Sequence, residues 1–171
     1  DVPGQITYRL EPPDDEGLRR FAGFPDIAAR FVTEPAATDG GGDPPAVRSV
    51  ELHQGGLVFE WLREGASYPV EVPLDSLTPL VGRYRDAAAS RTFTILVRQN
   101  RLAMAVPGET TYFLRPPDAE GWWVLRETDQ LAVRFEPAEG GEAGDPAAAI
   151  TVRGPGGQGT LPREAGGDAL P

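Results

Sequence analysis

VPGETTYFLRPPDAEG, residues 106–121, decides the fold, because VPGQITYRLEPPDDEG, residues 2–17, is a near copy of it. Without a gap the two segments agree at eleven of sixteen positions: Val, Pro, Gly, Thr, Tyr, Leu, Pro, Pro, Asp, Glu and Gly. Unrelated segments of this length would agree at roughly one or two positions. The same register carries on to an Arg-Phe pair in each copy, at 30–31 and 134–135. The chain is therefore predicted to contain a duplicated unit.

The two copies are unequal in length, and this predicts the domain boundaries. About thirty residues, roughly 74–105, precede the second copy and have no counterpart before Val2. The first unit is therefore expected to lack its opening strands, and a start at Asp1 instead of Met agrees with a fragment, a processed product or a trimmed piece. Two stretches rich in Gly, Pro and Ala, 35–46 and 137–149, are interpreted as the same exposed loop, where length changes cost little. The expected division is 1–64 for the end of the first unit, 65–79 for a linker with one short helical turn, 80–164 for a complete second unit and 165–171 for a disordered tail.

Alternation of apolar and polar residues predicts strands along most of the chain, and no stretch longer than about one turn has helical periodicity. Residues 92–98 and 101–106 should pair around a tight turn at Gln99-Asn100, and a glycine-rich turn should join 47–53 to 57–62. The other expected strands are 7–11, 18–21, 27–33, 81–85, 111–115, 121–126, 131–136, 149–153 and 159–161. Short strands at this spacing favour an all-β fold, either an up-and-down antiparallel barrel or a strongly curled sheet.

Composition excludes several kinds of chemistry. The formal net charge of −10 argues against a nucleic-acid partner, and the absence of cysteine excludes disulfides and thiolate nucleophiles. All 16 basic residues are arginine, so this chain by itself has no lysine for a Ser-x-x-Lys nucleophile, a P-loop or a Schiff base. The glycine-rich stretch 154–159 is expected to turn a hairpin and not to open a helix, so it is not interpreted as a phosphate cradle. No cofactor is expected, and without a long apolar run no membrane insertion is expected either.

Residues that could carry catalysis have ordinary structural interpretations. His53, the only histidine, lies at a predicted strand end with no neighbouring nucleophile in the sequence. The repeated acidic pairs, Asp14 with Glu16 and Asp118 with Glu120, lie in Pro-Pro-Asp-x-Glu-Gly turns, where solvated acids are ordinary. We therefore predict no catalytic residue and no metal site.

Trp122 and Trp123 are adjacent in a predicted strand, so one ring should face the core and the other should face away. The outward ring is a candidate for contact with a ligand or another domain, and packing under a loop is the alternative.

Several short motifs together resemble a known family. They are Pro73-Leu74, Gly82 with Tyr84, Pro107-Gly108, and His53-Gln54-Gly55 in the first copy. With these motifs the chain is similar to the β-domain that follows the catalytic domain in bacterial serine β-lactamase-related hydrolases, the penicillin-binding-protein-like and D-aminopeptidase group. The second copy departs from the pattern, with Arg-Gly-Pro in place of His-Gln-Gly.

The resemblance implies two consecutive antiparallel meander β-barrels of the lipocalin-like type, the first without its opening strands. It implies a non-catalytic accessory region of an exported, extracytoplasmic enzyme, with the catalytic hydrolase domain upstream in the same polypeptide. The region would shape substrate access, or support domain packing or a homo-oligomer. None of the family's catalytic motifs has a match here. The alternative is a module that binds a small apolar ligand in the barrel, for which Met104, Tyr112, Trp122 and Trp123 are the candidate residues.

Overall fold

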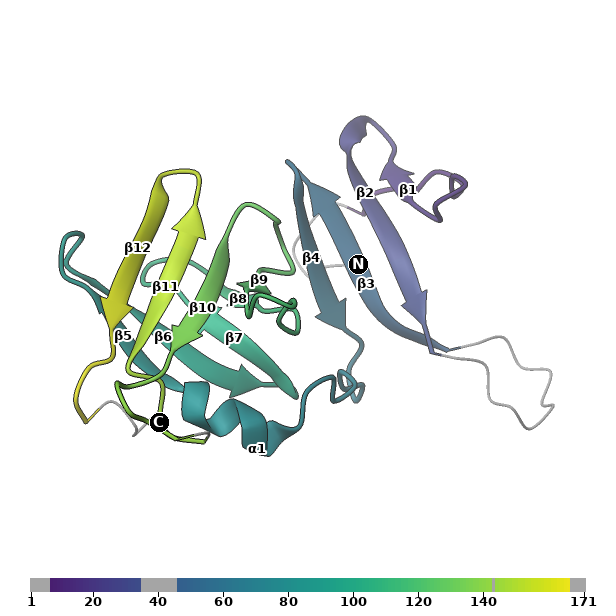
Figure 1. Cartoon of the computed structure of the whole chain (residues 1–171). Helices are drawn as coiled ribbons and strands as arrows, with labels where there is room; N and C mark the ends of the chain where they lie inside the picture. Colours follow the sequence, from purple (N-terminus) through teal and green to yellow (C-terminus); the bar gives the residue numbers. More distant parts are fainter. Residues whose placement is uncertain (1–6, 35–45, 143, 167–171) are drawn as a thin grey trace, which may run out of the picture. The chain divides into compact units, whose positions relative to one another are not determined.

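The structure is a computed structural model that describes residues 7–34, 46–142 and 144–166. The chain divides into two compact units, Asp1–Ser67 and Tyr68–Pro171. Residues 68–79, expected to form a linker, thus belong to the second unit. Each unit consists mainly of antiparallel strands, in agreement with the predicted all-β class (Figure 1).

The first unit is one four-stranded antiparallel sheet in the order β1-β2-β3-β4. Its strands are β1 (Arg19–Phe21), β2 (Phe24–Thr33), β3 (Val47–Gln54) and β4 (Leu57–Leu62). The predicted hairpin between β3 and β4 is present, and Gly55 and Gly56 form its turn with φ angles of 60° and 78°. Glycine suits this turn because both residues have positive φ, as a type I′ turn requires.

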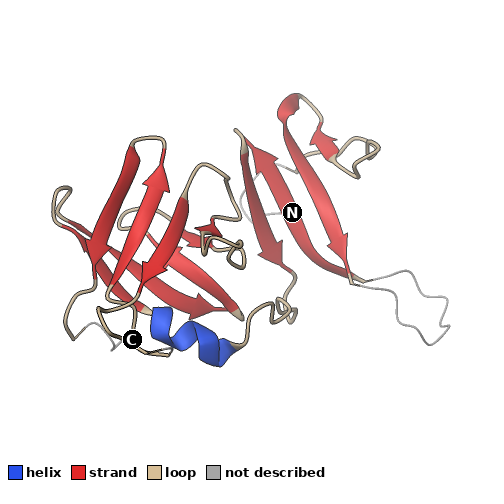
Figure 2. Ribbon diagram, in the orientation of Figure 1, coloured by secondary structure: helices blue, strands red, loops and turns tan. Residues whose placement is uncertain are grey.

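The second unit contains two four-stranded sheets and one short helical segment (Figure 2). The helical segment is α1 (Leu74–Leu77) followed by the 3₁₀ turn η1 (Thr78–Leu80). One sheet has the order β5-β6-β7-β8 and the other the order β12-β11-β10-β9. The strands are β5 (Gly82–Asp86), β6 (Arg91–Arg98), β7 (Arg101–Ala105), β8 (Thr111–Phe113), β9 (Trp123–Val124), β10 (Ala132–Glu136), β11 (Ala149–Gly154) and β12 (Gly157–Pro162).

The predicted barrel is not confirmed, because neither sheet closes on itself or on the other through a continuous ladder. Single β-bridges, Tyr84 to Arg163 and Leu114 to Leu125, are the isolated contacts between their edge regions. The chain at 111–126 is more irregular than its alternation suggests, and β8 and β9 are correspondingly short. Isolated backbone pairs continue the contact there, such as the Arg115 N–H to the Val124 oxygen, and side chains accept other N–H groups, as Asp118 does from Trp122 and Glu127 from Phe113.

The duplication is visible strand by strand. In the first unit Ala28 of β2 lies opposite His53 of β3, and the corresponding residues of the second unit, Ala132 and Arg153, lie opposite each other in β10 and β11. The pairing of β3 with β4 matches that of β11 with β12 in the same way. Even the isolated bridge from Leu10 to Phe21 has its equivalent between Leu114 and Leu125. The sheet β1–β4 is therefore the structural counterpart of β9–β12.

Other boundaries differ from the predictions. Residues 7–11 were expected to form a strand, but only the single bridge at Leu10 forms there. β2 begins earlier than expected, at Phe24 instead of residue 27. The loop at 35–45 and the end of the expected tail, 167–171, lie outside the described residues.

The core of the second unit is formed by apolar side chains from both of its sheets and from α1. In β6, Phe93 and Ile95 alternate with partly exposed threonines, so the strand buries one face as its period of two predicts. The tight turn predicted after β6 is present, with Gln99 and Asn100 both at positive φ. The cluster comprises Leu77, Tyr84, Phe93, Ile95, Leu102, Met104, Val106, Leu114, Trp123, Leu125, Val133, Ile150 and Leu161.

Candidate functional site

Three of the four candidate ligand residues lie together in the interior of the second unit. Met104 of β7 is fully buried and lies opposite Tyr112 of β8. Trp123 of β9 belongs to the same core cluster, and the Tyr112 side chain packs against that cluster from a partly buried position. The fourth residue, Trp122, is not among the members of this cluster.

The cavity that Trp123 lines is very small. A cavity of about 10 Å³ is lined by Glu71, Val72, Leu77, Asn100, Arg101, Leu102, Leu114, Pro116 and Trp123. That volume holds roughly one water molecule. Pockets for drug-sized apolar ligands are typically about 300–1,000 Å³. The cavity is therefore too small for a lipocalin-type ligand.

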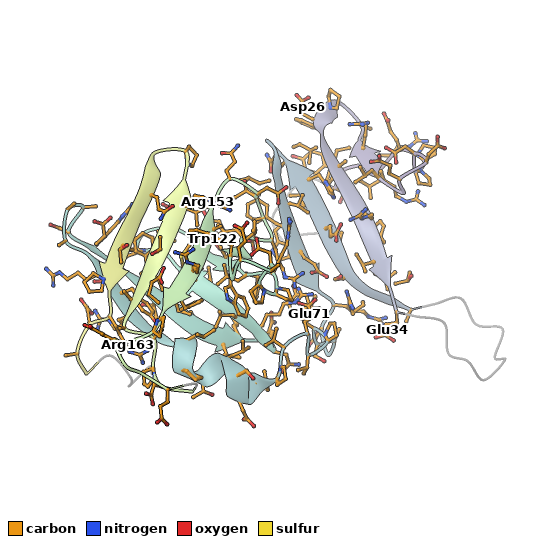
Figure 3. The ribbon with its side chains drawn as sticks, in the orientation of Figure 1. Asp26, Glu34, Glu71, Trp122, Arg153 and Arg163 are labelled. Carbon is orange, nitrogen blue, oxygen red and sulfur yellow. The ribbon has the colours of Figure 1, made fainter. Side chains whose placement is uncertain are left out.

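Trp122 faces away from the core, as one of the two tryptophans was expected to do, but it is only 4% exposed. The Arg153 guanidinium lies 4.3 Å from the centre of its indole ring and that of Arg134 lies 4.9 Å away (Figure 3). Cations over an indole face stabilise it electrostatically and shield it from water. The ring is thus packed under two arginines and offers little exposed surface to a partner.

A buried carboxyl that the sequence did not single out lies near Tyr112. Glu127 is 6% exposed, and its Oε1 accepts a hydrogen bond of 3.0 Å from the Phe113 backbone N–H. Its Oε2 is buried and has no hydrogen-bond partner among the described residues. Burial raises the pKa of Glu127 above its ordinary value, although the Phe113 N–H and the charge of Arg126 act in the opposite direction.

The Tyr112 hydroxyl belongs to the same acidic surroundings. It donates a hydrogen bond of 3.0 Å to Glu109 Oε2. Burial raises the pKa of the Tyr112 phenol, and the hydrogen bond to Glu109 and the charges of Glu109 and Glu127 raise it further. Tyr112, Glu109 and Glu127 thus form an acidic cluster, and the contacts described for it are hydrogen bonds.

A network around Glu71 attaches the segment before α1 to the sheet. Glu71 accepts hydrogen bonds from Arg101 Nη2, at 3.3 Å, and from Arg126 Nη2. The Arg101 guanidinium also stacks on the Tyr68 ring, 3.6 Å from its centre, and Asn100 Nδ2 donates to the Tyr68 carbonyl oxygen at 2.9 Å. A guanidinium with both an aromatic face and a carboxylate is well compensated for its burial. The network is structural and explains why residues from Tyr68 onward belong to the second unit.

The repeated acidic pairs organise turns. Asp14 Oδ1 accepts hydrogen bonds from the backbone N–H groups of Glu16 and Leu18, at 3.0 and 2.9 Å. Asp118 Oδ1 accepts from the N–H groups of Glu120 and Trp122, both at 2.9 Å. These are Asx turns that fold back the chain before β1 and β9. In the part of the chain that the structure describes, no group of three or more acidic or histidine side chains could hold a metal ion.

His53 does not meet a nucleophile on its strand. Its Nε2 lies 3.5 Å from Glu51 Oε2, and the same Glu51 oxygen accepts a hydrogen bond of 2.7 Å from Arg30 Nε. Ser49 is on the same face of β3, but its hydroxyl donates to Glu60 at 2.6 Å. Four residues along a strand separate Ser49 from His53 by about 13 Å, so the three residues form no catalytic triad.

An open groove lies at the α1 end of the second unit. Its volume is about 580 Å³. Phe135, Leu80 and two prolines give it an apolar lining, and carboxylates of α1 and of the β10–β11 loop add negative charge. Its lining comprises Asp75, Ser76, Pro79, Leu80, Phe135, Pro137, Glu142, Gly144, Asp145 and Ala147. We call it the α1 groove. Sequence patterns did not predict it, because it depends on how the β10–β11 loop lies over α1.

Comparisons with protein-family models, with curated proteins and with solved structures found no match to this chain. Within the described residues, no helix has the length and apolar character needed to cross a membrane.

Proposed function

We propose that the two units are non-catalytic accessory domains that act through their surfaces on a catalytic domain. The observation that carries this proposal is the filled interior of the second unit. Met104 is fully buried there, and the cavity beside Trp123 measures only about 10 Å³. A lipocalin-like binding module, the alternative function, would require room for an apolar ligand at these residues.

In this proposal the second unit is a flattened barrel, whose two sheets are joined at both edges by single bridges and not by continuous ladders. The bridges from Tyr84 to Arg163 and from Leu114 to Leu125 support this interpretation, because they join the two sheets at both edges. The Glu164 N–H also donates to the Arg83 carbonyl oxygen, which extends the contact between β5 and the end of β12. Joining the edges protects them from pairing with other chains.

The partner we propose is an exported serine β-lactamase-related hydrolase domain upstream in the same polypeptide. The positions of the motif residues support the resemblance. Gly82 and Tyr84 open β5 and are buried, and Gly108, at φ 78°, follows β7 in a turn. Glycine is required at position 82 for a steric reason, because a Cβ there would lie 2.9 Å from the Arg163 guanidinium carbon. His53 and Gln54 end β3 directly before the Gly55 turn.

The α1 groove is the proposed contact surface for a loop of the catalytic domain. Its apolar floor suits an apolar side chain, and Asp75, Glu142 and Asp145 favour a positively charged loop. Such a contact would narrow the entrance to the active site and so select among substrates by size.

Two measurements test the function. The purified chain should hydrolyse neither ester nor D-amino-acid amide substrates above the buffer rate, and the DNA upstream of the Asp1 codon should encode a domain with a Ser-x-x-Lys motif. Turnover by the chain alone, or an unrelated upstream domain, would contradict the proposal.

With the upstream domain attached, the double variant Asp75→Arg and Glu142→Arg should change KM for bulky substrates and leave kcat for a small ester unchanged. Glu139→Arg is the matched control, because Glu139 lies in the same loop but not in the lining of the groove. Equal effects of the double variant and the control would rule out the groove as the contact surface.

A further inference from the structure

The sheet of the first unit has one apolar and one polar face. Cross-strand neighbours share a face, so Phe31, Val50 and Trp61 lie side by side on one face of β2, β3 and β4. Ile27, Leu52, Leu57 and Phe59 belong to the same side by the period of two. We call this set the β1–β4 apolar face.

The opposite face carries the paired charged side chains of the sheet, together with Val32, Val58 and Leu62. Arg30 Nε donates to Glu51 at 2.7 Å, and Ser49 donates to Glu60 at 2.6 Å. In an antiparallel sheet with one face toward water, the apolar side chains gather on the face that is turned away from it. The sequence of β1–β4 thus specifies a half-buried sheet whose apolar face packs against another layer.

Two aromatic side chains on the apolar face are nevertheless largely exposed. Trp61 is 53% exposed and Phe31 is 45% exposed. The rings of Phe59 and Trp61 are stacked, with centroids 6.3 Å apart and planes 14° apart. Adjacent exposed aromatics of this kind mark a surface that another part covers.

The repeat shows what covers such a face. In the second unit the equivalents of Phe31, Val50 and Trp61 are Phe135, Ile150 and Leu161. Ile150 and Leu161 belong to one core cluster with Tyr84, Ile95 and Met104 of β5–β7, and Phe135 packs against that cluster. Leu161, the counterpart of the exposed Trp61, is only 8% exposed.

The first unit has a counterpart for only one strand of that covering sheet. Residues 7–9, Thr-Tyr-Arg, correspond to β8 by the repeat, and Leu10 forms the bridge that matches Leu114. Tyr8 takes the place of Tyr112, which pairs with Met104 of β7, and it is 44% exposed. No strand in the described part of the first unit corresponds to β5, β6 or β7.

We propose that the β1–β4 apolar face is covered by a three-stranded antiparallel meander of the β5–β7 kind, which pairs with residues 7–9 as its fourth strand. Its inward positions carry aliphatic and aromatic side chains equivalent to Tyr84, Ile95 and Met104. One position differs, since Arg19 replaces Trp123 on this face, and the meander must offer an acceptor to the guanidinium there. The β5–β8 sheet of a second copy of the chain cannot cover this face, because its inward side chains already pack in the core of their own unit.

The proposal does not depend on the hydrolase context, and adding the meander to the chain tests it. In the extended chain, a copy of residues 74–105 is placed directly before Val2. Acrylamide quenching of tryptophan fluorescence reports mainly on Trp61, because Trp122 and Trp123 are 4% and 8% exposed. The exposed fraction of Trp61 should fall from 53% toward the 8% of Leu161, with a severalfold loss of quenching.

A matched control carries Ile95→Asp and Met104→Asp in the added copy only. This control should remain as quenchable as the original chain, because buried unpaired carboxylates prevent the meander from packing. The extended chain should elute as a monomer in size-exclusion chromatography with light scattering.

Two results would overturn the proposal. One is equal quenching of the extended chain and its aspartate control, whether or not the added strands fold. The other is a dimer of the original chain in which Trp61 is already protected and Trp61→Ser, but not Val58→Ser on the opposite face, restores the monomer. That dimer would show that a second copy covers the face.

Discussion

Replacing Met104 by alanine tests whether the interior of the second unit is filled. Met104 is fully buried between Ile95 and Tyr112, its cross-strand neighbours. The substitution removes three heavy atoms, and at about 0.8 kcal/mol for each buried methylene equivalent the transfer cost is about 2.4 kcal/mol. A cavity term is added because close-packed neighbours relax only partly, and the total for such changes is about 2–5 kcal/mol.

Urea denaturation measures this loss. Trp61→Phe should serve as the background, so that Trp122 and Trp123 report only on the second unit. With a urea dependence of about 1–3 kcal/mol/M, a loss of about 3 kcal/mol lowers the midpoint by about 1–3 M. Val97→Ala is the control, because Val97 lies on the neighbouring strand β6 and is 38% exposed. It should cost about 0.5 kcal/mol or less.

A loss below about 1 kcal/mol for Met104→Ala would refute the reasoning, since a filled core cannot absorb the truncation so cheaply. The reasoning would also be refuted if Met104→Ala lowered the free energy of unfolding by no more than Val97→Ala does. Met104 would then border space that collapses or holds a ligand, and the binding-module alternative would regain support.

Two further predictions concern single hydrogen-bonding side chains. Glu127→Gln keeps an acceptor for the Phe113 N–H and removes a buried charge, so it should raise the free energy of unfolding at pH 7 by about 1 kcal/mol. Because burial raises the folded-state pKa of Glu127 above its ordinary value of 4.5, the difference in stability between the original and variant proteins should be smallest below pH 4.5, grow as the pH rises from 4.5 to the folded-state pKa, and stay constant above it. Urea midpoints measured against pH would show this, and a difference that shrinks toward pH 7 would contradict it. Asp118→Ala and Asp14→Ala each remove two N–H acceptor contacts from equivalent turns, and each should lower the stability of its own unit by about 1 kcal/mol. Hydrogen exchange of the N–H groups of Trp122 and Leu18 checks both, and unchanged protection in either variant would contradict the equivalence of the turns.

Local sequence patterns determined the strands and the duplication. Alternation places Phe93, Ile95 and Val97 on one face of β6; the structure buries Phe93 and Ile95, whereas Val97, near the end of the strand, is 38% exposed. The near copy at 2–17 and 106–121 predicted equivalent turns, and Asp14 and Asp118 hold them with the same contacts. These features depend on residues close together in the chain, so a short stretch of sequence contains the physical information that specifies them.

Only the tertiary structure decided which faces meet and which side chains gather. The Glu71 network joins residues about thirty and fifty-five positions apart, and the buried Glu127 depends on how its loop covers β8. Alternation predicted that one tryptophan would face outward, but the two arginines that cover Trp122 come from β10 and β11. Whether the two sheets close a barrel also depends on edge pairing between distant strands, which period-two patterns do not encode. The sequence by itself thus determined the repeat and its strands, whereas the filled interior and the exposed β1–β4 apolar face follow from long-range packing, because burial is a property of what lies opposite a residue.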